Sequence, residues 1–128
     1  MKITVRHYDQ EVHNGKRKLI DKFLRFLYNE YPVDSDVEIH FLPQRKGNMT
    51  TGSRDNNNVI KVLTKSRITR DIFRTLAHEW VHILQDNDPE TIKKTEREIE
   101  DHANSLSGYL VRKFQKENPH HEVEIYKD

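Results

Sequence analysis

The chain has 128 residues, of which 34% are hydrophobic and 34% are charged, and its formal net charge is +1. This length fits a single domain over residues 1–128, with a modest core under a heavily charged surface. Because acids and bases are interleaved and nearly balanced, no nucleic-acid partner is expected, and the basic clusters at 16–18 and 65–70 are interpreted as solvated helix starts and loops. The absence of cysteine excludes disulfides, thiolate metal ligands and a cysteine nucleophile.

The sequence also bears on where the protein works. Residues 1–7 lack an apolar stretch of signal-peptide length. Elsewhere no segment approaches the run of about 18 apolar residues that crosses a membrane as a helix. We therefore expect a soluble, cytoplasmic protein that does not interact with membranes.

The first half of the chain predicts two strands and one helix. Residues 2–6 alternate in polarity and include β-branched side chains, which indicates a short strand. An apolar stripe at helical spacing predicts a helix over 15–31, with Asn14 as its candidate cap. Residues 37–42 alternate as in a half-buried strand. The polar segment 43–58, which contains glycine, is typical of a long loop or a loose hairpin.

The second half predicts a strand at 59–64 and then an amphipathic helix at 69–85. Residues 88–90 have the Asp-Pro-Glu order of a helix start, and an apolar ladder over 92–114 predicts a long last helix. Residues 121–126 alternate weakly, which favours a short terminal strand. Together these elements predict a compact α+β domain with a small, mostly antiparallel sheet and three helices, the last two antiparallel to each other.

The most informative motif is His78-Glu79-Trp80-Val81-His82, inside the predicted helix at 69–85. Two imidazoles four positions apart lie on one helix face, at the spacing of two ligands of one tetrahedral zinc ion. Glu79 stands between them, where it could accept a proton from the water that attacks a peptide carbonyl. Trp80 is expected to pack in the core. The motif therefore predicts a zinc-dependent peptidase with Zn²⁺ as its cofactor and Glu79 as its general base.

A catalytic zinc site needs a third protein ligand. One extended form of the motif is excluded, because Gln85 and Asp88 stand where that form requires glycine and histidine. A short turn after the motif helix would fold the last helix back along it, which makes the last helix the expected source of the ligand. Its candidates are Glu96 and Glu100 on one flank and His102 on the other, and helical periodicity does not decide between the flanks.

The motif followed by Glu100-Asp101-His102-Ala103-Asn104 resembles the gluzincin metallopeptidases, especially the minigluzincins and the ImmA/IrrE-like members. The resemblance implies a zincin-like domain in which Glu100 is the third ligand. It also implies that Asn104 orients a metal-bound imidazole. With His102 as the ligand instead, the site would be all-histidine, as in SprT-like proteases.

A protein or peptide substrate would bind as an extended strand along a sheet edge. Residues 59–64 are the candidate edge, although the same pattern fits an internal strand equally well. Several side chains could stabilise the oxyanion, and none has a spacing that selects it: Arg45, Arg54, Arg97, His102 and Tyr109. Two other functions fit the sequence. One is a metallopeptidase-like regulator that binds a protein partner, such as a repressor, with little general proteolysis, and the other is a structural domain whose histidines bind metal weakly.

Overall fold

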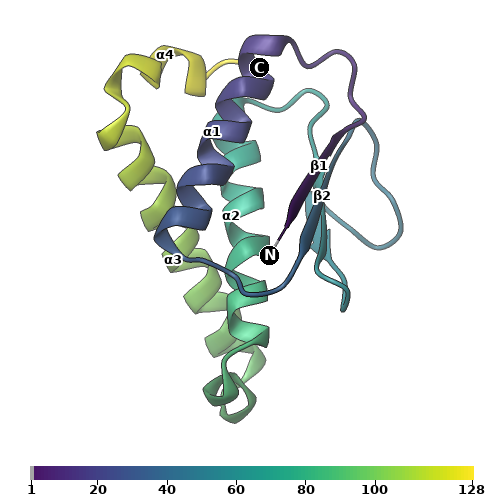
Figure 1. Ribbon diagram of the computed structural model, residues 1–128, viewed down its shortest axis with the longest axis vertical. Helices are drawn as coiled ribbons and strands as arrows, with labels where there is room; N and C mark the ends of the chain where they lie inside the picture. The colour runs from purple at the N-terminus through teal and green to yellow at the C-terminus, as the bar shows by residue number, and fades with distance from the viewer. Residues whose placement is uncertain (1) are drawn as a thin grey trace.

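The computed structural model describes residues 2–128, in which a four-stranded sheet carries the three long helices on one of its faces (Figure 1). The α+β class is as expected. The elements in chain order are β1 (Ile3–His7), α1 (Asn14–Glu30), β2 (Val37–Leu42), β3 (Gly52–Arg54), β4 (Val59–Leu63), α2 (Thr69–Asp86), the 3₁₀ helix η1 (Pro89–Lys93), α3 (Glu96–Glu117), η2 (Pro119–His121) and α4 (Glu122–Ile125).

The sheet has the strand order β1-β2-β4-β3 and is mixed. The β1–β2 and β2–β4 pairs are parallel, and only β3 and β4 run antiparallel. The expectation of a mostly antiparallel sheet is therefore wrong. The physical reason is the crossover by α1, which returns the chain to the end of the sheet where β1 began, so that β2 runs in the same direction as β1.

The order of the strands also corrects the predicted substrate edge. β4 lies between β2 and β3 and is internal, so the segment 59–64 offers no free edge. Its side chains Ile60 and Val62 are fully buried, in keeping with a central position. The edges of the sheet are β1 and the short strand β3, which forms within the segment expected to be a loop or loose hairpin.

The core is held together by aromatic side chains from all three long helices. Phe23 of α1 stacks on Phe73 of α2 with ring centroids 4.3 Å apart, and Phe114 of α3 meets the two rings edge-on at 5.2 and 5.4 Å. Trp80 is fully buried, as expected, and its indole N–H donates to the backbone carbonyl of Tyr31 at 3.0 Å. These contacts place the motif helix α2 at the centre of the helical layer.

Helices α2 and α3 lie side by side and run in opposite directions, as expected, and η1 lies in the turn that joins them (Figure 1). The long helix starts later than predicted. Asp88 caps only η1, whereas Thr95 and Glu98 form a reciprocal capping box at the start of α3. Because η1 does not continue the periodicity of α3, Ile92 is 89% exposed instead of lying on the apolar ladder.

The prediction of a terminal strand at 121–126 is also wrong, because the chain forms η2 and α4 there. In a strand, Val123 and Ile125 would share a face. In the structure Ile125 is buried in the core while Val123 is exposed, so the segment needs only one apolar anchor. None of the helices within residues 2–128 has the length and apolar character needed to cross a membrane.

The start of α1 differs from its prediction in two respects. Its N-cap is His13, whose Nδ1 accepts the backbone N–H of Lys16 at 3.1 Å, so that Asn14 is the first helical residue. Lys16 was expected to be solvated but is only 7% exposed, and its ammonium donates to the carbonyl of Arg67 at 2.8 Å. The long lysine stem is buried against the core while its charged end reaches a carbonyl.

Candidate metal centre

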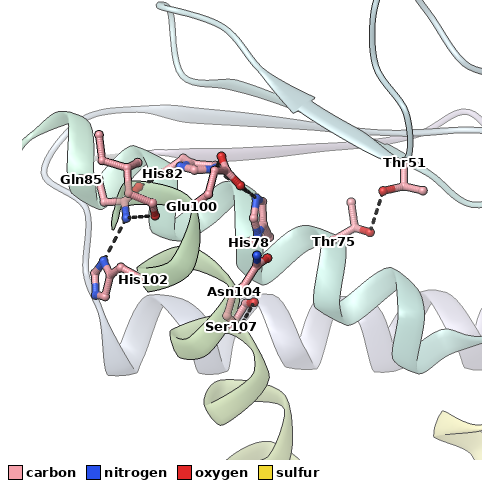
Figure 2. A network of polar contacts seen from close by, with 10 residues as sticks. Thr51, Thr75, His78, His82, Gln85, Glu100, His102, Asn104 and Ser107 are labelled. Carbon is pink, nitrogen blue, oxygen red and sulfur yellow. Dashed lines mark hydrogen bonds and ion pairs between the residues drawn. The ribbon is translucent and has the colours of Figure 1, made fainter. Parts of the chain in front are cut away.

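The His-Glu-x-x-His motif lies on α2, and its two histidines face the first turns of α3 (Figure 2). The Nε2 atoms of His78 and His82 are 3.0 Å apart. Glu100 of α3 brings its two carboxylate oxygens to 3.3 Å from His78 Nε2 and 3.0 Å from His82 Nε2. The ligating atoms of these three residues all lie within 4.8 Å of one another, and within residues 2–128 they form the one group that could hold a metal ion.

The donor set fits a divalent cation. His82 uses its Nδ1 to reach the side-chain oxygen of Gln85 at 2.8 Å, so that Nδ1 carries the proton and Nε2 presents a lone pair. This lone pair points at the other imidazole and at the Glu100 carboxylate, and converging acceptors of this kind are the arrangement that a divalent cation binds. The Glu100 side chain is 55% exposed, so the group is open to solvent on one side, as a catalytic rather than a structural metal site is.

Gln85 positions His82, a role that was not recognised in the sequence. Its side-chain oxygen accepts from His82, and its nitrogen contacts the Ile99 carbonyl and His102 Nδ1, each at 2.9 Å. A buried amide held from α3 in this way fixes both the ring orientation and the tautomer of His82. The only sequence signal was its place one turn after His82.

The structure distinguishes the three candidates for the third ligand by position. Glu100 lies with the histidines, whereas His102 points away from them and contacts Gln85 (Figure 2). Glu96 lines a pocket next to the group and is not part of it. The crossing of α2 and α3 therefore turns the Glu100 flank towards the motif.

Asn104 lies one turn after Glu100, and its side chain lies near the His78 ring, where it acts to raise the pKa of the imidazole. Figure 2 shows it at the opposite end of that ring from Glu100. The role that the resemblance implies for Asn104, orientation of a metal-bound imidazole, stays a prediction. Each histidine of the motif thus has a side-chain amide beside it, which is Asn104 for His78 and Gln85 for His82.

Burial shifts the protonation of two groups in the site. The pKa of His78 is lowered, first because burial disfavours the charged ring and next because His82 is close, although Glu100 opposes the shift. Burial also raises the pKa of the Glu79 carboxyl, which is only 8% exposed. A neutral imidazole can bind metal, and a carboxylate with a raised pKa is a stronger general base.

The edge strand β3 lies directly against this part of α2. An ideal Cβ on Gly52 would stand 2.4 Å from Thr75 Cγ2 and 3.4 Å from Glu79 Cγ, so only glycine allows this close approach. Arg54, two residues later in β3, donates from Nη2 to Asp86 at 3.0 Å, near the end of α2. The short strand therefore follows α2 along the motif.

Two pockets flank the motif and share His78 and Glu79. The first, here the Arg54 pocket, has a volume of about 520 Å³ and is also lined by Ser53, Arg54, His82, Glu96, Ile99 and Glu100. The second, here the Arg74 pocket, has a volume of about 250 Å³ and is also lined by Thr51, Arg74, Thr75, Asn104 and Ser107. Both pockets adjoin His78 and Glu79 between the β3 segment and α3, and the two together are here called the cleft. His78, His82 and Glu100 are here called the metal group. Among the side chains considered for the oxyanion, Arg54 is the one that lines this cleft.

Comparisons with protein-family models, with curated proteins and with solved structures found no match to this chain. The resemblance to gluzincins therefore stays a prediction carried by the motif residues at 78–82 and 100–104. What the chain shows independently of any relative is the geometry of His78, His82 and Glu100.

Proposed function

We propose that the protein is a zinc-dependent peptidase whose zinc ion is held by His78, His82 and Glu100. The observation that carries the proposal is the convergence of these three side chains beside the buried Glu79, in the cleft. Two imidazoles and one carboxylate are a common ligand set of catalytic zinc, which leaves a fourth position for substrate or water. The other acids of α3, including Glu96, lie outside the group.

When bound, zinc supplies a Lewis acid that polarises the scissile carbonyl and makes water a nucleophile at neutral pH. The protein supplies the proton transfer. A carboxylate oxygen of Glu79 accepts the proton of the attacking water and passes it to the nitrogen of the leaving amine. Because burial raises the pKa of Glu79, the carboxylate holds that proton more readily between the two transfers.

A peptide substrate has a natural place beside β3. Within the described residues this strand pairs only with β4, and it lies at the edge of the sheet next to Glu79. A peptide added there as a further strand would make backbone hydrogen bonds to β3 and cross the motif between the two pockets. This location replaces the segment 59–64, which is internal.

The test compares the zinc-loaded wild type with Glu79→Gln on a mixture of defined peptides, with cleavage followed by mass spectrometry. We expect both proteins to bind one zinc per chain, and we expect the substitution to slow cleavage by about 100-fold or more, because only the base is lost. Glu96→Gln is the matched control, since it removes an acid from the same cleft outside the ligand group and should keep cleavage intact.

Two results would contradict the proposal. Equal cleavage by wild type and Glu79→Gln would show that Glu79 is not the base. A wild type that holds one zinc per chain and cleaves no peptide would favour the regulatory alternative, in which the cleft binds a protein partner with little proteolysis.

A further inference from the structure

Two arginines from facing helices converge beside the cleft. The guanidinium Nη1 of Arg112 on α3 and Nη2 of Arg74 on α2 lie 3.3 and 3.8 Å from the position that a Cβ on Gly108 would take. Because Gly108 has no side chain, the two guanidinium groups can both occupy the space beside it. An anion placed at this point would be attracted by both positive charges at once.

Within residues 2–128, no carboxylate forms an ion pair with Arg74 or Arg112, as is also true of Arg17, Arg25, Arg45, Arg67 and Arg70. Asp71 stands three residues before Arg74 on α2 and is not paired with it either. The charge of the two guanidiniums is therefore available to a ligand.

Arg74 connects the pair to the cleft, because it lines the same pocket as His78 and Glu79, whereas Arg112 lies beside Gly108 and outside the lining of that pocket. The rest of that pocket consists of hydroxyl and amide groups from Thr51, Thr75, Asn104 and Ser107. The Arg54 pocket differs in charge, because it contains Glu96 and Glu100, and Arg54 itself is paired with Asp86. The cleft is thus cationic on one side of the metal group and more acidic on the other.

The direction of β3 tells which part of a substrate would meet the arginines. Gly52 lies beside Thr75, and Arg54 reaches Asp86, so β3 and α2 run the same way. An antiparallel pair is the commoner arrangement between strands, and a peptide added to β3 in this direction runs against α2. It passes the Arg54 pocket first, then His78 and Glu79, and then the Arg74 pocket. Residues that follow the scissile bond therefore reach the arginines.

We propose that Arg74 and Arg112 form a subsite for a carboxylate on the carboxyl-terminal side of the scissile bond. The carboxylate is either an acidic side chain or the free end of the peptide. A carboxylate matches the planar N–H groups of a guanidinium and would be attracted by both arginines. The proposal rests on the proposed peptidase function and adds the substrate class, which is peptides with a negative charge shortly after the cleaved bond.

The test measures binding rather than turnover. Three probes carry a hydroxamate at the amino end, which chelates zinc and directs the rest of the probe to the carboxyl-terminal side. They are a Leu-Asp amide, a Leu-Asn with a free carboxyl end and a Leu-Asn amide. On the zinc-loaded wild type at low salt, we expect at least one carboxylate probe to bind about tenfold more tightly than the uncharged amide. The probe that gains tells which kind of carboxylate the subsite takes.

The double variant Arg74→Gln, Arg112→Gln should abolish this preference without loss of zinc, and Arg112→Glu should reverse it. Both side chains are exposed, so the fold should survive, and circular dichroism checks that it does. Arg25→Gln is the matched control, because it removes an exposed arginine of α1 that lines neither pocket of the cleft and should keep the preference.

Different failures have different meanings. Tight but equal binding of all three probes would overturn the subsite and leave the zinc centre standing. A preference that survives the double substitution would also overturn it. If none of the probes binds to protein that holds one zinc per chain, the cleft does not receive peptides in this direction and the subsite is refuted. The fate of the peptidase itself is read separately, from the cleavage assay with Glu79→Gln.

Discussion

Replacing Gly52 with alanine tests how closely β3 approaches the motif helix. The new methyl group would stand 2.4 Å from Thr75 Cγ2 and 3.3 Å from the Lys61 carbonyl oxygen, distances that force a shift. Thr75 cannot simply rotate, because its hydroxyl accepts from Arg67 Nη2 at 2.9 Å. The backbone of Gly52 has no positive φ, so alanine meets no backbone strain there and the cost is steric.

The net effect on stability follows from two opposing contributions. Overpacking of this kind lowers the free energy of unfolding by about 2 kcal/mol. Alanine also restricts the unfolded chain, which returns about 0.7 kcal/mol. We therefore expect Gly52→Ala to lower the free energy of unfolding by about 1.3 kcal/mol, measured from the midpoint of urea denaturation. Because Glu79 Cγ is the next neighbour, peptide cleavage should fall as well.

A second substitution shows whether the named contact is the cause. Thr75→Ser removes the clashing Cγ2 and keeps the hydroxyl, and alone it should cost about 0.8 kcal/mol for the lost methyl group. In the double variant the methyl group introduced by Gly52→Ala would fill the vacated space, so the two effects should not add, with a coupling of about 1–2 kcal/mol. A neutral Gly52→Ala, or a double variant whose loss equals the sum of the single losses, would refute this account of the β3–α2 contact.

Three further predictions concern the metal centre. Zinc content should be lost in Glu100→Ala and kept in His102→Ala and Glu96→Ala, and loss in the His102 variant alone would show that the wrong flank of α3 was assigned. Gln85→Leu removes the acceptor that fixes His82, so zinc affinity measured by competition with a chelator should fall about tenfold, and an unchanged affinity would count against the positioning role. Acid should release zinc as the histidines become protonated, because a protonated imidazole cannot bind metal. Since burial lowers the pKa of His78 in the metal-free protein below its ordinary value of about 6.5, this ring should take up its proton only below that pH, as an NMR titration of the metal-free protein would show. A His78 ring that is mostly protonated at pH 6.5 would contradict the lowered pKa.

Local patterns in the sequence were sufficient to predict much of the helical layer. The apolar spacing of α1, α2 and α3 follows the helix period, and this period is a property of each segment by itself. Trp80 was assigned to the core on the same grounds and is fully buried. The spacing of His78 and His82 is by itself sufficient to place both imidazoles on one helix face, because four residues make about one helical turn.

The remaining features depend on contacts between segments that are distant in the chain. Whether β4 is an edge or an internal strand depends on β3, and this strand of three residues is too short for its sequence pattern to predict a strand. The sequence by itself determined the motif, the helix that carries it and the helix that would complete it. Only the tertiary structure decided that Glu100 rather than His102 joins the histidines and that Gln85 holds His82, because periodicity fixes the faces of one helix but not the angle at which two helices cross.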